Sequence, residues 1–282
     1  MSQSPAPRKE QVREDWAKRG SYWDEWADQM GEQSDIFNLP FVEIADIRPG
    51  QRTLDLASGA GEPALTIAKK VGPSGHVTAT DLVDEMLAGI RRRAADRKLT
   101  NLDFRLADME NLPFEDESFD RVTCRFGIMF SSDISRTFAE AFRVLKPGGR
   151  AAYMVWGPLT DNTVIAETTA VAEKELGFWP WNDDINPFRF PEAGILGPEM
   201  AKAGFTGVRE EDIIVNPRRP LDGRPFWQAQ IDMGVGPHLD TRDPAVRERI
   251  NQAVEAALEK YIEDDFHVFK SHVRVVVGDK PA

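Results

Sequence analysis

The chain contains one cysteine and no long apolar run. Cys124 is the only cysteine among 282 residues, so neither an internal disulfide nor a thiolate zinc cluster can form. No apolar stretch is as long as the about 18 residues that a membrane-spanning helix needs. The polar segment Met1–Glu10 lacks the apolar core of a secretory signal. These absences predict a cytoplasmic protein with no membrane span and no structural metal.

Basic side chains are scarce relative to acidic ones. Lysine and arginine number 35 against 47 aspartates and glutamates, which gives a net charge of −12. A phosphate backbone would be repelled by this excess, so nucleic acid is not expected as a partner. The 41% of hydrophobic residues and 29% of charged residues are typical of a globular protein with a real core.

Strand and helix patterns alternate over the first half of the chain. Strands are expected at 53–57, 75–80, 102–106, 119–125 and 150–156, with helices at 62–71, 83–98 and 135–145 and a turn at 146–149. Some of the strands, such as Ala151–Trp156, are nearly continuous apolar runs, which is typical of parallel strands that are covered on both faces. This alternation predicts a doubly wound α/β fold.

The pattern is less regular after residue 156. Helices are expected at 160–176, 198–204 and 244–261 and strands at 208–215 and 266–277, around a segment at 177–191 that is dense in aromatics and prolines. We therefore predict an N-terminal helical arm at 1–45, a cofactor-binding core at 46–157, a lid insert at 158–197, and the remainder of the core at 198–282 with a helical insert at 217–265.

A glycine-containing turn follows the first predicted strand. Gly59 and Gly61 stand between that strand and the next helix, where open α/β sheets bind ligands and where a missing Cβ lets a nucleoside approach the backbone. Pro63 suits the first turn of that helix. Asp81 ends the second strand, 20 residues after Gly61, and can accept hydrogen bonds from ribose hydroxyls. A dinucleotide or another nucleoside cofactor fits these features.

Two residues separate the possible cofactors. Ala64 stands where the dinucleotide fingerprint has its third glycine. Asp55, four residues before Gly59, would repel a pyrophosphate but attract a cation, and S-adenosylmethionine carries both an ammonium and a sulfonium. A third acid, Asp108, ends the third strand, where it can accept from an adenine amine.

Five motifs together resemble a known family. They are Asp55-x-x-x-Gly59-x-Gly61, Asp81, Asp108-Met109, Leu112-Pro113-Phe114-x-x-x-Ser118-Phe119-Asp120 and Val144-Leu145-Lys146-Pro147-Gly148-Gly149. Over residues 48–156 the chain is similar to class I S-adenosylmethionine-dependent methyltransferases, in the branch of the ubiquinone/menaquinone C-methyltransferases. The resemblance implies a Rossmann-like seven-stranded sheet of order 3-2-1-4-5-7-6, with strand 7 antiparallel, and S-adenosylmethionine as the cofactor.

The resemblance also implies roles for single residues. Asp55 would organise the methionine ammonium directly or through water, and Asp81 would bind the ribose, with Leu82 beside the adenine. The other implied cofactor contacts are Gly59 and Gly61 beneath the methionine and ribose, Asp108 and Met109 at the adenine, and Arg125 near the methionine. Related quinone enzymes often have a small polar residue at the position of Arg125, so this arginine argues against a quinone acceptor.

The acceptor is expected to be a small apolar or aromatic molecule that is methylated at oxygen or carbon. Tyr22, Trp23, Trp156, Trp179 and Trp181 are candidates for its binding wall, although aromatic residues in such segments are more often core. His238 is the candidate general base, because the histidines at 76, 267 and 272 fall at or within predicted strands.

Other functions stay open from the sequence. N-methylation of a small molecule, a nicotinamide-dependent oxidoreductase and a catalytically silent binding protein on the same fold are the alternatives. Nucleobase methylation is disfavoured, because Cys124-Arg125-Phe126-Gly127 stands where those enzymes carry Asn/Asp-Pro-Pro-Tyr.

Overall fold

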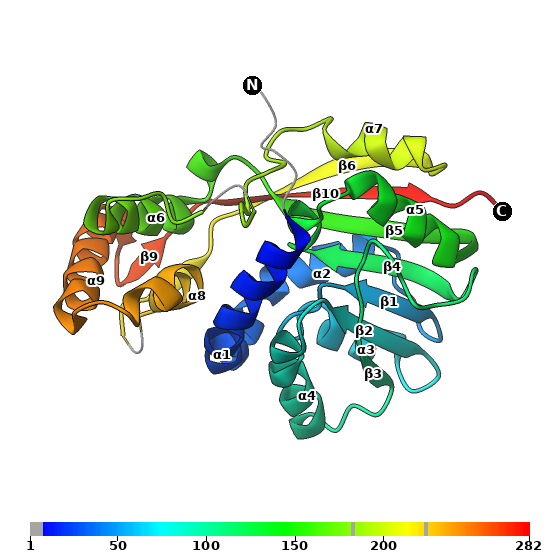
Figure 1. Ribbon diagram of the computed structural model, residues 1–282, viewed down its shortest axis with the longest axis horizontal. Helices are drawn as coiled ribbons and strands as arrows, with labels where there is room; N and C mark the ends of the chain where they lie inside the picture. Colours follow the sequence, from blue (N-terminus) through cyan, green and yellow to red (C-terminus); the bar gives the residue numbers. More distant parts are fainter. Residues whose placement is uncertain (1–7, 182–183, 223–224) are drawn as a thin grey trace.

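The computed structural model describes residues 8–181, 184–222 and 225–282 (Figure 1). Residues 1–7 of the predicted arm, 182–183 of the predicted lid insert and 223–224 of the predicted helical insert lie outside the described residues. The α-helices are α1 Lys9–Gln33, α2 Asp35–Ile44, α3 Ala64–Val71, α4 Leu87–Asp96, α5 Ile134–Val144, α6 Thr163–Leu176, α7 Leu196–Lys202, α8 Gln228–Leu239 and α9 Pro244–Leu258. Short 3-10 helices are η1 Asp84–Met86, η2 Ile128–Phe130, η3 Leu159–Asp161 and η4 Glu259–Tyr261. The strands are β1 Arg52–Leu56, β2 His76–Asp81, β3 Leu102–Leu106, β4 Phe119–Arg125, β5 Leu145–Trp156, β6 Thr206–Val215, β7 Arg218–Pro220, β8 Ile262–Glu263, β9 Phe266–Val268 and β10 Ser271–Asp279.

Seven strands form the main sheet, in the order β3-β2-β1-β4-β5-β10-β6. The first five are parallel, and β10 is antiparallel to both of its neighbours, β5 and β6. This is the predicted order, with β10 as the seventh core strand, and it confirms the doubly wound fold. The carboxyl ends of β1, β2 and β4 consequently meet at one edge of the sheet, where this class of fold binds its ligands.

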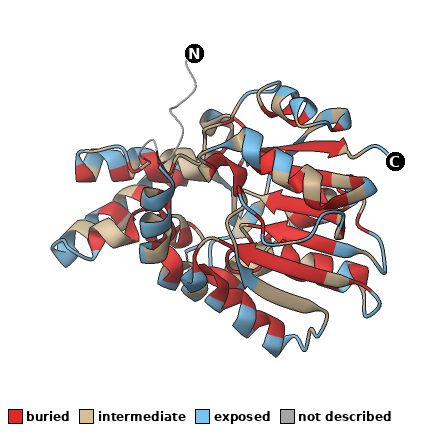
Figure 2. Ribbon diagram, turned by 45° about the vertical axis from the view of Figure 1, so that its right-hand side comes forward, coloured by how far each residue is buried: buried red, intermediate tan, exposed pale blue. Residues whose placement is uncertain are grey.

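Alternate residues of β5 pack against helices on opposite faces of the sheet. Ala152 and Met154 belong to a cluster with apolar residues of α2, α3 and α4, whereas Tyr153 and Val155 pack with those of α5 and α7. Such alternation follows from the two-residue period of a strand. Figure 2 shows the result as buried strands between helices whose outer sides are exposed. The sheet therefore has two apolar cores and a rigid edge on which loops can hold a ligand.

A second lobe lies beside the main sheet. It consists of α6, α8, α9 and a small sheet of order β7-β9-β8, and its apolar cluster includes Ala172, Ile231 and Val254. Helix α1 runs between this second lobe and the main sheet (Figure 1). Trp26 of α1 is fully buried against Met233 of α8, and its Nε1 donates to Asp232 Oδ2 at 3.1 Å. Helix α1 thus joins the two parts of the molecule.

Two predicted elements differ from the structure in the second half of the chain, and one helix there was not predicted. The expected single strand at 266–277 is two strands, because β9 pairs with β7 in the small sheet while β10 joins the main sheet. Helix α8 was not predicted, since Gly234, Gly236 and Pro237 within it resemble turn signals. The helix expected at 244–261 gives way to η4 after Leu258.

Smaller differences lie in the first half. Pro63 is the N-cap residue of α3 instead of standing in its first turn, so the helix begins at Ala64 and not at residue 62. The expected helix at 83–98 divides into η1 and α4. The turn expected at 146–149 is a bulge within β5, because Leu145 pairs with Phe119 and Arg150 with Arg121.

Candidate active site

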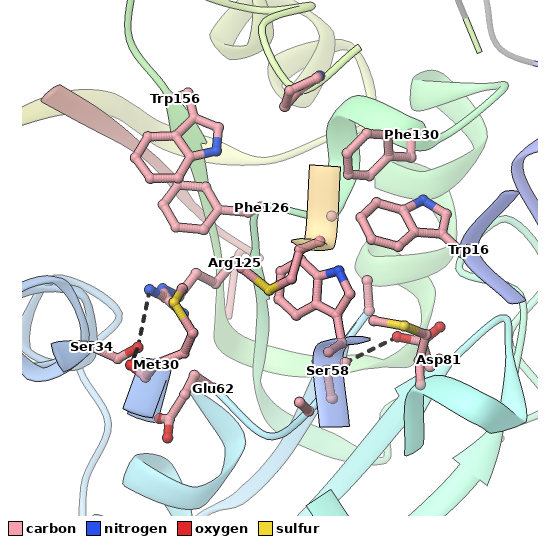
Figure 3. Close-up of a pocket in the computed structure, with 18 of the residues that line it drawn as sticks. Trp16, Met30, Ser34, Ser58, Glu62, Asp81, Arg125, Phe126, Phe130 and Trp156 are labelled. Atoms are coloured by element: carbon pink, nitrogen blue, oxygen red, sulfur yellow. Dashed lines mark hydrogen bonds between the residues drawn. The ribbon is translucent and has the colours of Figure 1, made fainter. Parts of the chain in front are cut away.

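A cavity of about 300 Å³ lies where the main sheet, α1 and the second lobe meet (Figure 3). One side is formed by the loops that follow β1, β2, β3 and β4, a second by the inner face of α1, and a third by α6, α8 and the small sheet. Segments that are far apart in sequence therefore enclose one space, and the loops of the sheet and the second lobe face it from different directions.

The loop after β1 supplies a backbone platform. Gly59 and Gly61 have φ values of +50° and +122°, in a region that side chains with a Cβ disfavour. A Cβ on Gly61 would come within 2.7 Å of Leu65 Cδ1, so the loop can follow this path only with glycine there. Both glycines line the cavity. A flat ligand can therefore lie directly against this backbone.

Asp81, at the end of β2, holds the same loop in place. Its Oδ2 accepts from Gly59 N–H at 3.0 Å and its Oδ1 accepts from Val83 N–H at 3.1 Å. Burial raises the pKa of Asp81 to about 6, although the backbone N–H donors of Gly59, Val83 and Leu82 oppose that shift. A carboxylate has about four acceptor positions, so each oxygen can still accept from a ligand hydroxyl.

Asp55 lies behind the lining of the cavity. Its side chain is fully buried in β1, where Oδ1 accepts from Thr123 Oγ1 at 2.6 Å and Oδ2 has no hydrogen-bond partner among the described residues. Burial raises the pKa of Asp55 to about 7. The cavity lining does not include Asp55, which disfavours the direct contact implied by the resemblance and leaves the indirect one.

The end of β3 is linked to α1 by charge. Lys9 Nζ lies 2.7 Å from Asp108 Oδ2 and 2.6 Å from Glu110 Oε2, and all three residues line the cavity. Glu110 is buried, which acts to raise its pKa, but hydrogen bonds from Lys9, Ser132 and Asp133 lower the pKa overall. The start of α1 is therefore fixed across the expected adenine end of the cavity.

Arg125 projects into the cavity from the end of β4. Its Nη2 lies 3.5 Å from Ser34 Oγ, and its Nε is buried without a hydrogen-bond partner (Figure 3). Burial lowers the pKa of Arg125 to about 10, against the attraction of the carboxylates of Glu62 and Asp55. Glu62 itself accepts from Arg93 Nη2 at 2.7 Å and from Asn38 Nδ2 at 2.6 Å. Arg125 thus keeps donors available for an anionic group.

Aromatic rings form the walls nearest Arg125. Phe126 has a φ of +57°, unusual for a bulky residue, and its ring stacks on Trp156 with centroids 4.1 Å apart. Trp16 of α1 contacts Phe130 edge to face, with centroids 5.0 Å apart, and also contacts Trp23. In Figure 3 the labelled rings lie above Ser58 and Glu62, which belong to the loop after β1. An apolar or aromatic ligand can be covered by these rings.

Most of the predicted site residues meet at this cavity. The lining includes Gly59, Gly61, Asp81, Leu82, Asp108, Met109, Arg125, Trp23, Trp156 and Trp181.

Three further predicted residues do not line the cavity. Tyr22 faces α8, where its hydroxyl donates to Asp240 Oδ2 at 2.5 Å, because neighbouring residues of a helix point in different directions and Trp23 takes the cavity side. Trp179 is 41% exposed, outside the lining. His238 contacts Phe178 edge to face at 5.1 Å, and burial lowers its pKa, but it does not reach the cavity.

Other lining residues were not predicted as part of the site. Lys9, Trp16 and Met30 come from α1, Phe126 and Phe130 follow β4, and Arg219 comes from β7. The aromatic residues at 126 and 130, directly after the fourth strand, are a usable signal, because that strand end was already assigned to the ligand edge. No sequence signal indicates which side of α1 faces the cavity.

Comparison with known proteins gives the family. The model of the ubiE/COQ5 methyltransferase family matches residues 12–161, more than half of the chain. The chain belongs to this family. Its fold, its motifs and its relatives make it an S-adenosylmethionine-dependent methyltransferase, so the nicotinamide-dependent alternative is wrong.

A curated relative supports this assignment, and solved structures share the fold. A ubiquinone/menaquinone biosynthesis C-methyltransferase of Pseudomonas putida is 33% identical over 59% of this chain and 70% of its own length. The [4+2]-cyclase SpnF shares the fold over 100% of this chain and 99% of its own, with a TM-score of 0.60 and 20% identity. A Haemonchus contortus phosphoethanolamine N-methyltransferase 2 in complex with S-adenosylmethionine has a TM-score of 0.54 and 21% identity over 87% of this chain and 52% of its own.

Within the described residues, no group of three or more histidine, cysteine or carboxylate side chains could hold a metal ion. Among the same residues, no helix is long and apolar enough to cross a membrane.

Proposed function

We propose that this methyltransferase acts on oxygen or carbon of a small apolar or aromatic acceptor. One observation supports the proposal above others: a single cavity joins the glycine loop and Asp81 to the stacked rings of Phe126 and Trp156. The loop offers a polar backbone surface for a nucleoside, and the rings offer an apolar surface for the acceptor. Both surfaces face the same space, as a transfer between two bound molecules requires.

The residues of the sheet edge fit S-adenosylmethionine. Asp81 would accept from the ribose hydroxyls, Asp108 and Met109 would hold the adenine beside Leu82, and Gly59 and Gly61 would lie under the ribose and methionine. Arg125, whose Nε lacks a partner, would bind the methionine carboxylate. Asp55 would act on the ammonium through its charge or a water molecule, with Glu62 as the nearer carboxylate in the lining. These opposite charges match a zwitterionic ligand end.

The chain's contribution to the reaction is positioning and exclusion of water. S-adenosylmethionine supplies an electrophilic methyl group on a sulfonium, which is already a good leaving group. The aromatic rings and α1 would hold the acceptor's oxygen or carbon in line with that methyl group and away from bulk water. Within the described residues, no histidine, cysteine or tyrosine lines the cavity, so His238 is no longer favoured as a general base.

The part of the chain outside the family match also bears on the choice of acceptor. The matched segment ends at residue 161, whereas Trp181 and Arg219 line the cavity from the second lobe. The curated relatives are named for C-methylation in ubiquinone and menaquinone biosynthesis. Because the family match ends before Trp181 and Arg219, it does not cover this acceptor side, and we favour an apolar or aromatic compound other than a quinone, with N-methylation as the alternative.

Calorimetric titration tests the proposal in two stages. S-adenosylmethionine and S-adenosylhomocysteine should each bind with one site per chain, and NAD should not bind. A screen of phenols, aromatic acids and quinols should then yield S-adenosylhomocysteine with one acceptor class, and NMR of the product should locate the methyl group on oxygen or carbon. Transfer only to amines would replace the proposal by N-methylation. Absence of binding by both adenosyl compounds would refute the cofactor site.

A further inference from the structure

Charge is distributed unequally around the cavity. The acidic residues of the lining come from the carboxyl end of β2 or from the loops after β1 and β3 of the main sheet. They are Glu62, Asp81, Asp108 and Glu110. The part of the lining that comes from α6, α8, β7 and the neighbouring segments is otherwise apolar or neutral. Among the described residues of that part, only Arg219 carries a charge. The far wall of the cavity is therefore apolar with one cation.

Arg219 has no carboxylate partner in the described part of the chain. Its one hydrogen bond, from Nη1 to the carbonyl of Arg218, is long at 3.4 Å. Burial lowers its pKa, and no neighbouring charge opposes that effect. The other lining cations differ, because Lys9 and Arg93 form ion pairs at 2.6–2.7 Å and Arg125 is attracted by Glu62 and Asp55.

The adjacent arginine shows what an ordinary surface arginine does on this strand. Arg218 lies 4.0 Å from Glu263 and 3.9 Å from Asp264, and its guanidinium lies over the ring of Phe266. Successive residues of a strand face opposite sides, so Arg218 points away from the cavity that Arg219 lines. Arg19, Arg125 and Arg189 are also buried or partly buried and form no ion pair with a described residue, but a nearby carboxylate acts to raise the pKa of each. No carboxylate of the described residues acts on Arg219 in this way.

The surroundings of Arg219 are aromatic. Phe226 and Phe269 line the same part of the cavity, with ring centroids 4.7 Å apart. Arg219 is paired across β7 and β9 with His267, whose ring stacks on Phe269 and whose Nδ1 is buried without a partner. Removing a guanidinium from water among such groups costs free energy unless an anion meets it. A ligand with an anionic group would supply what the protein does not.

We propose that Arg219 binds a carboxylate at the end of the acceptor that lies away from the cofactor. The proposal rests on the proposed function, because it assigns the second-lobe side of the cavity to the acceptor. It defines the acceptor as an amphiphilic acid: an apolar or aromatic body lies between Phe226, Phe269 and the rings near β4, and one carboxylate meets Arg219. Arg219 is then a determinant of specificity and takes no part in the methyl transfer.

A matched pair of ligands and three variants, one of them a control at the neighbouring arginine, test this role. Naphthalene-2-carboxylate and naphthalene-2-carboxamide have the same rings and differ in charge. Each would be titrated calorimetrically into wild type, Arg219→Gln, Arg219→Lys and Arg218→Gln, all saturated with S-adenosylhomocysteine. Wild type should bind the carboxylate at least about tenfold more tightly than the amide, which is the difference in affinity expected for a charge-assisted contact. Arg219→Gln should abolish that preference, Arg219→Lys should keep part of it, and Arg218→Gln should leave it unchanged.

The outcomes separate this proposal from the one beneath it. Affinity for S-adenosylhomocysteine should be the same in all four proteins, because Arg219 lies on the acceptor side. Equal binding of acid and amide by wild type, binding of neither, or an unchanged preference in Arg219→Gln would each overturn the role of Arg219 while the cofactor site stands. Failure of wild type to bind S-adenosylhomocysteine would instead refute the proposed function itself.

Discussion

The backbone N–H of Gly59 donates to Asp81 Oδ2 at 3.0 Å and so joins the turn after β1 to the end of β2. The bond is buried, and the same carboxylate also accepts from Val83 N–H. Asp81 therefore has two tasks, because it fixes the glycine loop and presents its remaining acceptor positions to the cavity. A substitution of Asp81 is therefore expected to affect both the ligand contacts of its carboxylate and the conformation of the loop at Gly59.

Replacing Asp81 by asparagine should weaken cofactor binding, because it removes the charge and replaces one of the two oxygens that accept from the N–H groups of Gly59 and Val83. The amide keeps one acceptor oxygen but loses the charge, so ribose hydroxyls lose charge-assisted hydrogen bonds. We expect the dissociation constant of S-adenosylhomocysteine to rise about tenfold to a hundredfold in calorimetric titration. Asp84→Asn is the control, because Asp84 is exposed and pairs with Arg91 on the surface. Unchanged affinity in Asp81→Asn would remove Asp81 from the cofactor site.

Cofactor binding should release a proton near pH 6. The pKa of Asp81 is raised to about 6 and that of Asp55 to about 7, in both cases by burial. A ribose that donates to Asp81, or an ammonium near Asp55, favours the ionised form and lowers these pKa values. Titrations with S-adenosylhomocysteine in two buffers of different ionisation enthalpy should show proton release at about pH 6 and almost none at about pH 8. Asp81→Asn should reduce the release, and equal heats in both buffers at about pH 6 would contradict the prediction.

Asp55 and Asp81 should also affect how the free energy of unfolding of the unliganded protein depends on pH. Between about pH 4 and pH 7 the folded chain keeps protons on Asp55 and Asp81 that the unfolded chain has lost. Their contribution to the free energy of unfolding is therefore largest below about pH 4 and falls as the pH rises through about 7. In urea unfolding, the free energy of unfolding of wild type should therefore fall relative to that of Asp55→Asn as the pH rises from about 4 to about 7. An identical pH slope in the two proteins would show that Asp55 is not buried as described.

Gly61→Ala should destabilise the fold more than a glycine substitution at open space. The new Cβ would meet Leu65 Cδ1 at 2.7 Å, Leu65 is only 1% exposed and cannot easily move, and φ at this position is +122°. We expect a loss of about 2 to 4 kcal/mol in the free energy of unfolding. Gly177→Ala is the matched control, because φ is +79° there but nothing lies within 4 Å, so about 1 kcal/mol should be lost. Equal losses in urea unfolding would mean that the glycine loop is not sterically constrained.

How much the sequence predicts depends on how local the determining interactions are. Strands β1 to β4 and the charged residues at or near their ends could be placed, because strand patterns alternate with helical ones between turns and the sheet order then brings those ends together. The small sheet could not, since β7 has three residues and pairs Arg219 with His267, far along the chain. A strand that short has no detectable period, so its cavity residue was not predicted.

The cavity side of α1 was equally hard to predict. Tyr22 and Trp23 are adjacent aromatic residues, and the sequence offered both as wall candidates. Only Trp23 lines the cavity, because the helix is fixed in rotation by Trp26 packing on α8 and donating to Asp232. The rotation of α1 about its axis is therefore determined by tertiary packing between residues far apart in the sequence, and a local pattern does not contain that information.

Lys9 should control how fast the cofactor enters and leaves. Its Nζ pairs with Asp108 and Glu110, at the first turn of a helix whose inner face lines the cavity through Val12, Trp16 and other residues. Lys9→Ala removes that tie, so the start of α1 should open more often, and both the association and the dissociation rate of S-adenosylhomocysteine should rise. The dissociation constant should change less than either rate, because opening of α1 speeds entry and exit together. Stopped-flow tryptophan fluorescence can follow the binding, since Trp16 and Trp23 line the cavity. Lys18→Ala is the control, because Lys18 pairs within the same helix with Asp15, at 3.8 Å.

The stability of the Lys9→Ala variant should change little. The ion pairs of Lys9 are partly exposed, so the free energy of unfolding should fall by no more than about 1 kcal/mol. Unchanged rates in Lys9→Ala would show that α1 does not have to move for the cofactor to bind.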